Sequence, residues 1–337
     1  MNDLTDNNGM AGPALMGFLA GPEEHAHAPN TRRAYGRDVA YFWRWAELSA
    51  GRAEHYPIEK ALLLDFVRQH TEGLGADLQA KLEAEGWRRQ AGPYAAATLT
   101  RILDALSYPH RCQDLPDPCR DRYVRHLLRL LRRRECSQGG RLRKAAITSD
   151  VLERMVATCG HSAQGARDAA LLRVGLFGGG RRRSELVALD ATDLLPIEGG
   201  YLLRIARSKT DQQGDGRHVP LLGTTAEAVT AWLAHAQITT GALFRSVDKA
   251  GRIGGRLSDR SVHRVVTRRL REAGLDPSRY SAHSLRSGFI TQAAQLGIPL
   301  PEAMAMSGHR AVEVAMRYYR EGELLAGRAA RLDSLPS

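Results

Sequence analysis

Successive helical patterns fill residues 29–135 of this chain, and this feature most constrains its fold. Apolar residues recur there at three- and four-residue spacing, and no alternating strand pattern interrupts them. Asn30 or Thr31 is suited to cap the first helix. Further helices are predicted over residues 58–70, 78–90, 94–108 and 120–134. Residues 29–135 are therefore expected to form an all-helical domain.

The pattern changes beyond that region. Residues 136–146 are polar, basic and glycine-containing, as is typical of an interdomain linker. Short strands are predicted over 201–206 and 218–222, around a polar turn. Helices are predicted over 148–158, 166–177, 225–236, 258–273, 283–296, 301–306 and 312–319. The expected fold class is mainly α: a helical amino-terminal domain, then a mixed α/β domain over 147–337 with a small antiparallel sheet.

Length and composition agree with two soluble domains. The chain has 337 residues, more than one hydrophobic core usually serves. Residues 1–28 are rich in Gly, Pro, Ala and Asn and are expected to be a flexible arm. The first twenty residues contain no basic residue, unlike a secretory signal, and no apolar run is long enough to cross a bilayer. A cytoplasmic protein without membrane association is therefore expected.

The charge balance favours a polyanionic partner. Lys and Arg number 48 against 37 Asp and Glu, which gives a formal net charge of +11. Nucleic-acid binding and simple solubility both explain such a surplus. The four cysteines show no C-x-x-C pairing, so neither a zinc site nor a disulfide framework is expected.

Arg182 is the first candidate for phosphodiester chemistry. It lies in G-G-G-R-R-R-S-E-L, where glycines permit a tight turn before a helix whose amino terminus favours an anion. Cleavage adds negative charge to the phosphate oxygens, and arginine meets such charge with paired donors. Glu185, three residues further on, is placed to orient Arg182. Arg181 and Arg183 compete for the role, and a solvated basic turn is the alternative.

A second group of candidates follows a hundred residues later. His283 and Arg286 stand at i and i+3, which places both on one face of a predicted helix. Arg286 is suited to hold another phosphate oxygen, and His283 to donate a hydrogen bond or relay a proton. A lone H-x-x-R is common, so two surface residues are the plain alternative.

His309 and Tyr318 complete the carboxy-terminal candidates. His309 follows Gly308 in a loop, from which it can contact a phosphate. Tyr318 lies nine residues later on a predicted helix. A phenol is a poor nucleophile at neutral pH, but neighbouring arginines stabilise phenolate. Tyr319 is an immediate rival, and the two point about 100° apart on a helix. A packed core tyrosine is the alternative for either.

Lys209 is the candidate proton donor. It lies in R-S-K-T-D, where the first predicted strand leads into the polar turn. A lysine on a hairpin can reach a departing oxygen and protonate it. Solvated turn lysines are far commoner, so this assignment depends on the other candidates. No phosphate-binding loop, zinc-protease motif or acidic cluster for a two-metal nuclease is present in the sequence.

Several arginines are candidates for contact with a nucleic-acid backbone. One predicted helix has a basic stripe opposite an apolar one, although a merely solvated face would look the same. Another predicted helix repeats arginine at every fourth position. The candidates are Arg32, Arg33 and Arg37 on the first helix, Arg125, Arg129, Arg132 and Arg133 on the fifth, and Arg256, Arg260 and Arg264 on the later one.

Taken together and in order, these motifs resemble those of the tyrosine site-specific recombinases of the phage integrase family, with features similar to recombinases of the Cre kind. The match runs from Asn30 to about Arg331. In the family's pattern the catalytic positions are an arginine, a hairpin lysine, H-x-x-R, a G-H histidine and a tyrosine. They fall on Arg182, Lys209, His283, Arg286, His309 and Tyr318. One departure is that G-G-R stands where the family usually has T-G and a hydrophobic residue.

The resemblance implies a mechanism and an assembly. Residues 29–135 would be a core-binding domain and residues 147–337 a catalytic domain, which together form a C-shaped clamp on DNA. The tyrosine would attack the scissile phosphate to give a 3′-phosphotyrosyl link, without metal, ATP or other cofactor. Four protomers, monomeric or dimeric when free, would exchange strands between two specific sites through a Holliday junction. A second recombinase or an accessory protein is a further possible partner.

The resemblance also defines two rivals. A type IB topoisomerase shares the tyrosine and arginines but relaxes DNA without choosing a site; the helical amino-terminal domain argues against it. A catalytically silent DNA-binding regulator would keep the fold, but the complete polar set argues against that reading. The segment after Tyr318 resembles a helix that docks on a neighbouring protomer, although the sequence alone indicates only a short amphipathic helix.

Overall fold

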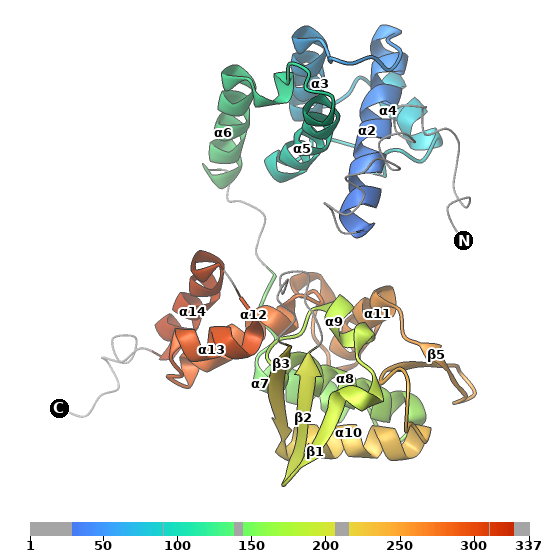
Figure 1. Ribbon diagram of the computed structural model, residues 1–337, viewed down its shortest axis with the longest axis vertical. Helices are drawn as coiled ribbons and strands as arrows, with labels where there is room; N and C mark the ends of the chain where they lie inside the picture. The colour runs from blue at the N-terminus through green and yellow to red at the C-terminus, as the bar shows by residue number, and fades with distance from the viewer. Residues whose placement is uncertain (1–28, 90, 138–143, 206–215, 310, 327–337) are drawn as a thin grey trace, which may run out of the picture. The chain divides into compact units, whose positions relative to one another are not determined.

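The computed structural model describes residues 29–89, 91–137, 144–205, 216–309 and 311–326. The chain divides into two compact units, Met1–Leu142 and Arg143–Ser337 (Figure 1). Within the described residues, no helix is both long and apolar enough to cross a membrane. The same residues contain no cluster of three or more His, Cys, Asp or Glu side chains that would hold a metal ion.

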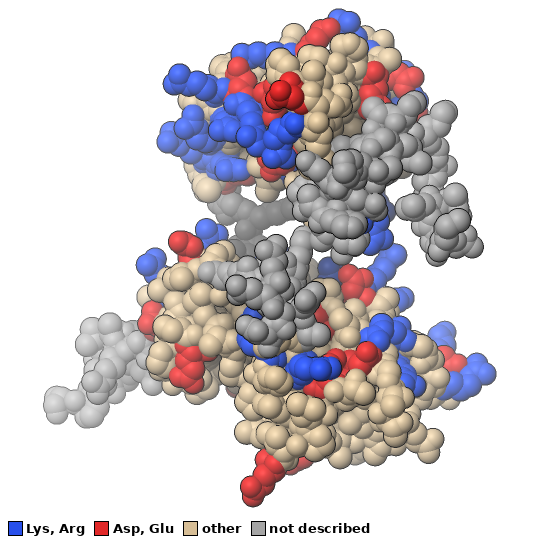
Figure 2. Space-filling view, in the orientation of Figure 1, with Lys and Arg blue, Asp and Glu red and all other residues tan. Residues whose placement is uncertain are grey.

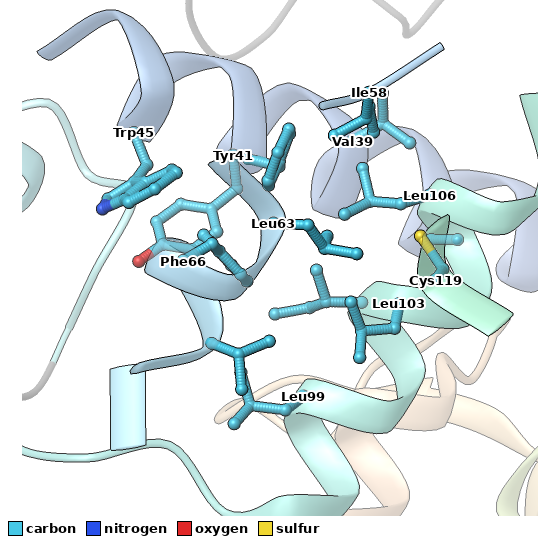
Figure 3. Close-up of a cluster of buried hydrophobic side chains, with 14 of the residues drawn as sticks. Val39, Tyr41, Trp45, Ile58, Leu63, Phe66, Leu99, Leu103, Leu106 and Cys119 are labelled. Atoms are coloured by element: carbon cyan, nitrogen blue, oxygen red, sulfur yellow. The ribbon is translucent and has the colours of Figure 1, made fainter. Parts of the chain in front are cut away.

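All of the regular secondary structure in the described residues of the first unit is helical. Its elements are α2 (Pro29–Ala50), α3 (Lys60–Glu72), α4 (Ala76–Ala84), α5 (Ala96–Cys112), the 3₁₀ turn η1 (Pro118–Arg120) and α6 (Arg122–Ser137). The apolar faces of α2, α3 and α5 meet in one core, shown in Figure 3. Trp45 and Phe66 pack edge to face there with ring centroids 5.0 Å apart, beside the fully buried Leu63 and Leu99. Each such side chain contributes about 1.5–3 kcal/mol by leaving water.

Two buried histidines connect the helices of this core. His70 on α3 donates from Nδ1 to the carbonyl of Phe66 at 2.7 Å. Its Nε2 therefore accepts the hydroxyl of Tyr41 at 2.5 Å. His110 likewise donates to a carbonyl of its own helix and accepts the amide of Ile58 at 3.0 Å. Burial lowers the pKa of His70 to about 3, so this ring is neutral at physiological pH.

The second unit combines helices with two small sheets. Its helices are α7 (Ser149–Ala157), α8 (Ala163–Phe177), α9 (Arg183–Ala188), α10 (Gly223–Ala236), α11 (Asp259–Glu272), α12 (Ser284–Gln295), α13 (Leu300–Ser307) and α14 (Val312–Ala326), with 3₁₀ turns η2 (Ala191–Asp193) and η3 (Pro277–Arg279). Figure 1 shows the three-stranded sheet beside α10 and α8, and α12, α13 and α14 gathered at another side of the unit.

The larger sheet is antiparallel, in the order β1 (Leu194–Ile197), β2 (Gly200–Ile205) and β3 (Arg217–Leu222). Ile197 pairs with Gly200, so β1 and β2 are joined by the two-residue turn Glu198–Gly199. Gly199 has φ +76°, a value that a tight hairpin turn requires and glycine adopts freely. A second antiparallel pair consists of β4 (Arg245–Val247) and β5 (Ile253–Arg256).

Alternating residues of the larger sheet face the core of the unit. Leu203, Val219 and Leu221 are buried, and they belong to one apolar cluster with Trp232 of α10 and Leu171 of α8. Their neighbours along β3 are exposed, which is the expected period of two for a sheet with one covered face.

Helices α12, α13 and α14 form a smaller apolar cluster of their own. Ile290 of α12 packs there with Ala315 and Tyr319 of α14. A Cβ added to Gly322 would lie 2.4 Å from the carbonyl oxygen of Thr291, so glycine permits the close approach of α14 to α12. This packing fixes the helix that carries the candidate tyrosine against the helix that carries the candidate arginine.

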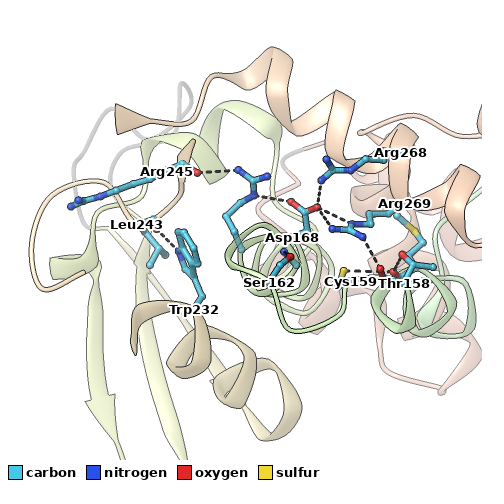
Figure 4. Close-up of polar contacts among 12 residues, drawn as sticks. Thr158, Cys159, Ser162, Asp168, Trp232, Leu243, Arg245, Arg268 and Arg269 are labelled. Carbon is cyan, nitrogen blue, oxygen red and sulfur yellow. Dashed lines mark hydrogen bonds and ion pairs between the residues drawn. The ribbon is translucent and has the colours of Figure 1, made fainter. Parts of the chain in front are cut away.

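A buried ionic network ties α8 to α11 (Figure 4). Asp168, with no exposed surface, forms ion pairs with Arg167, Arg268 and Arg269. Arg269 also contacts Glu272 at 2.8 Å. Removal of one partner from such a network leaves a buried charge uncompensated.

The expected fold class, mainly helical with a small antiparallel sheet, is confirmed. Some boundaries were wrong. The helix expected over 78–90 ends at Ala84, because Gly86 has φ +75° and the chain turns there. Strands β1, β4 and β5 were not predicted. Arg256, expected on a helix, lies on β5, since α11 begins only after the Ser258 cap.

Candidate active site

Glycines 178–180 bring three elements together. They end α8, and Gly179 and Gly180 have φ +87° and +67°. A Cβ on Gly180 would lie 2.9 Å from Cα of Arg286, and one on Gly179 would lie 2.5 Å from the carbonyl oxygen of Met306. Only glycine therefore allows this turn to touch both the start of α12 and the end of α13.

Arg182 stands at the amino end of α9, as the turn and helix in the sequence predicted. Its guanidinium donates to Glu185 at 2.6 Å, and its backbone amide donates to the other carboxylate oxygen at 3.1 Å. Burial alone would raise the pKa of Glu185, but the neighbouring Arg181 and Arg182 hold that pKa below its ordinary value. The side chain of Arg182 remains 41% exposed, so one face of it is open to a ligand.

Arg286 is almost completely buried at the start of α12. Its Nη1 donates to the carbonyl oxygens of Gly180 at 2.9 Å and Ser307 at 2.7 Å. Its Nη2 has no hydrogen-bond partner within the described residues. Burial, and then the charge of Arg182, lower the pKa of Arg286 to about 10, so it remains a cation at neutral pH. A buried cation with a free donor is suited to an anionic ligand.

The two histidines lie within the field of the same arginines. Burial, then Arg286 and Arg182, lower the pKa of His283 below its ordinary value. The same causes, in the same order, lower the pKa of His309 to about 3. Nδ1 of His309 is 2.8 Å from the hydroxyl of Ser307. Both rings are therefore neutral near pH 7, and each can donate one proton in a hydrogen bond and accept another.

The structure distinguishes the two neighbouring tyrosines. Tyr319 is buried, and its hydroxyl donates to the carbonyl of Ile298 at 2.8 Å. Tyr318 is half-buried; its backbone carbonyl accepts from Thr291 at 3.3 Å. Within the described part of the chain, the phenol of Tyr318 makes no hydrogen bond to the arginines or histidines of the site. Arg182, Arg286, His283 and His309 are thus brought together, whereas Tyr318 is held nearby in the packing of α12 and α14.

The remaining candidates have mixed outcomes. Lys209 lies outside the described residues. Figure 2 shows Lys and Arg gathered over α6, where the side chains of Arg125, Arg129, Arg132 and Arg133 are exposed. On α2 Arg32 is half-buried, and Arg33 and Arg37 are exposed, as are Arg260 and Arg264 on α11. Arg256 instead donates to the carbonyl of Val187 at 2.7 Å and pairs with Asp190, so its charge is largely used within the fold.

Two further arginines face the same site. Arg181 is 2% exposed, and its charge acts on both Arg286 and His309. Arg217, at the start of β3, also acts on Arg181 and Arg286. The sequence indicates Arg181 only as a rival of Arg182. Arg217 belongs to no recognisable motif. The one sequence signal for it is a positive charge directly after the polar turn.

Comparison with known proteins agrees with this geometry. The profile of the Phage integrase family matches residues 145–323. An integrase/recombinase XerD homolog from Selenomonas ruminantium is 29% identical over 318 residues, which cover 91% of this chain and 86% of that protein. The recombinase Cre of Escherichia phage P1 is 25% identical over 72% of this chain and 76% of that protein.

Solved structures show the same fold. A lambda integrase fragment, in a dimer bound to a core site, matches with a TM-score of 0.59 and 16% identity, over 90% of this chain and 91% of that one. The XerH recombinase bound to a palindromic difH substrate matches with a TM-score of 0.57 and 18% identity, over 91% of this chain and 80% of that one. The family profile matches more than half of the 337 residues of this chain, so the chain belongs to the phage integrase family and is a tyrosine recombinase.

Proposed function

We propose that the protein recombines DNA at specific sites through a transient bond between Tyr318 and a DNA 3′-phosphate. The phenolic oxygen of Tyr318 attacks the scissile phosphorus, and the bond to the 5′ oxygen breaks. The 5′-hydroxyl of a partner strand then attacks the phosphotyrosine and releases the phenol. Each step exchanges one phosphate ester for another, so neither ATP nor a metal ion is required by the balance of the reaction.

The observation that carries this proposal is the uncompensated positive charge around the glycine turn. Arg182 and Arg286 lie together with Glu185 as their neighbouring carboxylate, and Nη2 of Arg286 is buried without a partner in the described residues. A phosphate oxygen would satisfy that donor, and a second oxygen would meet the open face of Arg182. Donors fixed in advance stabilise the extra charge of the pentacoordinate transition state.

Neutral histidines suit the transfer of protons in this mechanism. His283 is placed at the start of α12 and near the surface, where it would accept the proton of the attacking phenol. His309 would donate a hydrogen bond from Nε2 to a phosphate oxygen, with Nδ1 oriented by Ser307. Lys209 would protonate the departing 5′ oxygen; this role rests on its position in the sequence alone.

The choice of Tyr318 rests on its contrast with Tyr319. The hydroxyl of Tyr319 is occupied by the carbonyl of Ile298, and its ring is buried. The phenol of Tyr318 is free of hydrogen bonds within the described residues and only half-buried. Its helix needs to bring this oxygen within reach of phosphorus, in line with the 5′ oxygen, once DNA occupies the site.

The proposed partner is double-stranded DNA, contacted by both units. Residues 29–135 would form the core-binding domain, linked through 136–146 to the catalytic domain over 147–337. The exposed arginines of α6 and those of α11 are suited to phosphate contacts, which give affinity without reading the bases. Four protomers would act on two sites through a Holliday junction, with the segment after Tyr318 docked on a neighbour. A lambda integrase dimer and XerH have been solved on their DNA sites.

A nicked suicide duplex tests the nucleophile. Such a substrate loses its short 5′-hydroxyl fragment after cleavage and traps the covalent adduct. Tyr318→Phe is expected to abolish the adduct while DNA affinity stays within about twofold, because the hydroxyl that is removed makes no hydrogen bond to the arginines of the site within the described part of the chain. Tyr319→Phe is the matched control and should retain adduct formation. Adduct formation by Tyr318→Phe would refute the assignment. Relaxation of plasmids that lack a recombination site would instead indicate topoisomerase activity.

A further inference from the structure

The carboxyl end of α13 is held by arginines from three separate segments: the turn before α9, the start of β3 and the start of α12. The last carbonyls of a helix have no partner within the helix and require another donor. Here Met304 receives the amide of Gly308 at 2.8 Å. The next three carbonyls each receive a guanidinium: Ala305 that of Arg217 at 3.3 Å, Met306 that of Arg181 at 2.7 Å, and Ser307 that of Arg286 at 2.7 Å.

Arg181 and Arg286 make equivalent contacts, because each donates to one carbonyl of the glycine turn and to one at the end of α13. Arg286 joins the carbonyl of Gly180 to that of Ser307, and Arg181 joins the carbonyl of Gly179, at 3.0 Å, to that of Met306. Each arginine therefore connects the glycine turn to the end of α13. Cations at this position also interact favourably with the negative end of the helix dipole.

The contact with Arg217 explains the glycine that follows α13. Gly308 has φ +68°, the left-handed conformation typical of a helix end. A Cβ there would lie 2.0 Å from Nη1 of Arg217, so any other residue would displace that arginine. His309 follows at once and is oriented by Ser307. The position of His309 is thus set by the same helix end that the arginines hold.

We propose that Arg181 and Arg217 are positioning residues, which hold the end of α13 so that His309 and Arg286 meet one phosphate. This inference rests on the function proposed above. It concerns residues of this chain in particular, because the family pattern usually has a hydrophobic residue where Arg181 stands. Neither arginine touches the phosphate in this proposal; Arg181 is 2% exposed, its Nη2 is used by two carbonyls, and its Nε is buried without a partner within the described residues.

Electrostatics adds a second effect to this positioning. Burial lowers the pKa of Arg181 to about 10, so the side chain stays charged at neutral pH beneath the site. The charged or titratable groups that act on His309 are Arg286, Arg182, His283 and Arg181. Loss of Arg181 removes one cation from this set and therefore raises the pKa of His309.

The test measures single-turnover cleavage of the suicide duplex by full-length variants at saturating protein. Arg181→Met is expected to lower the cleavage rate about 10- to 100-fold, as a small misplacement of catalytic groups does, with DNA affinity within about threefold. Arg181→Lys, which keeps the charge and a donor, should recover most of the rate. Arg183→Met is the matched control, because it removes the same charge from an exposed side chain next but one in sequence. Its cleavage rate should stay within about twofold.

An NMR titration of histidine-labelled protein distinguishes positioning from a general loss of structure. The pKa of His309 should rise in Arg181→Met but stay below its ordinary value, and it should not change in Arg183→Met. Wild-type cleavage by Arg181→Met, or equal losses in both variants, would overturn the proposal. If circular dichroism shows that Arg181→Met does not fold, Arg217→Met decides: a severalfold loss supports the proposal and wild-type cleavage overturns it. Failure of the nucleophile assignment would appear separately, as an adduct formed by Tyr318→Phe.

Discussion

The second unit, Arg143–Ser337, contains two clusters of arginines that differ in how their charge is compensated. Around Asp168, three arginines share a carboxylate with no exposed surface, and Glu272 adds a second (Figure 4). Around the glycine turn, Arg181, Arg182, Arg217 and Arg286 act on one another with Glu185 as the carboxylate that acts on Arg181 and Arg286. The first cluster has three arginines and two carboxylates, whereas the second has four arginines and one carboxylate and so leaves more positive charge for a ligand.

The difference shows which buried arginines are structural. Arg167 and Arg269 direct their donors to Asp168 and to backbone oxygens, so they stabilise the junction of α8 with α11. Nη2 of Arg286, by contrast, has no partner within the described residues, and the side chain of Arg182 remains open. A fold tolerates such unsatisfied donors where binding supplies the missing acceptor. One donor of the first cluster, Nε of Arg268, is also without a partner there, so the contrast lies in the charge balance.

The largest expected effect comes from breaking the compensated cluster. Asp168→Asn leaves buried guanidinium groups without their carboxylate and should lower the free energy of unfolding of the second unit by about 3–5 kcal/mol. Urea titration followed by the fluorescence of Trp232, with the other tryptophans replaced, measures this change. Glu185→Gln is the matched control: its closer ion pair is with the part-exposed Arg182, at 2.6 Å, and the buried Arg181 is 3.6 Å away, so the loss should be smaller. Equal losses in the two variants would contradict the distinction between the clusters.

A smaller effect is expected from pH in the helical unit. His70 has a folded-state pKa of about 3, below the ordinary value of 6.5. Between these values the unfolded chain binds a proton that the folded unit excludes. Stability is therefore complete above about pH 6.5 and falls as the pH is lowered towards 3, by about 1.4 kcal/mol per pH unit. Urea titrations at pH 5.5 and 4.5, followed by Trp45 fluorescence, measure the slope.

His70→Gln is the control for that slope, because an amide does not titrate in this range. The variant will be less stable at pH 7, because the histidine joins Tyr41 to Phe66. The free energy of unfolding of the variant should nevertheless depend less on pH, by the same amount of about 1.4 kcal/mol per pH unit. If the free energy of unfolding changed equally with pH in the two proteins, His70 would have to be protonated in the folded state.

The sequence predicted where several candidate residues lie in the fold, because each of them belongs to a short local motif. Arg182 was placed by Ser184, Glu185 and a glycine turn, and the structure puts it at a helix start with Glu185 bound to it. The spacing of His283 and Arg286 likewise predicted one face of one helix, and in the structure His283 is the N-cap of α12 and Arg286 lies in its first turn. Local spacing cannot show which of three consecutive arginines turns inwards. Arg181 does so only because the end of α13, distant in sequence, offers it a carbonyl.

The errors in the fold have a similar cause. Strand β1 reads L-L-P-I, and its proline obscured a strand that sits at the edge of the sheet, where a missing amide donor is tolerated. The four-residue repeat of arginine from Arg256 suggested a single helix. Leu257 and Ser258 interrupt it, because Ser258 caps α11 through the amide of Ser261 and the chain before it is extended. Pairing between distant segments, which a repeat does not encode, decided both cases.

The smallest expected effect separates two histidines whose pKa values are both lowered to about 3. For His70 the main cause is burial in an apolar core; for His309 burial acts together with Arg286 and Arg182. An anion bound between those arginines offsets their charge and should raise the pKa of His309 by about one unit, whereas His70 should not change. Nitrogen-detected NMR of histidine-labelled protein, titrated over pH with and without vanadate, measures both. The Arg286→Met variant should lose the response to vanadate. A shift at His70 as large as that at His309 would mean that the anion acts on the whole protein, and the contrast between a closed core and an open cationic site would fail.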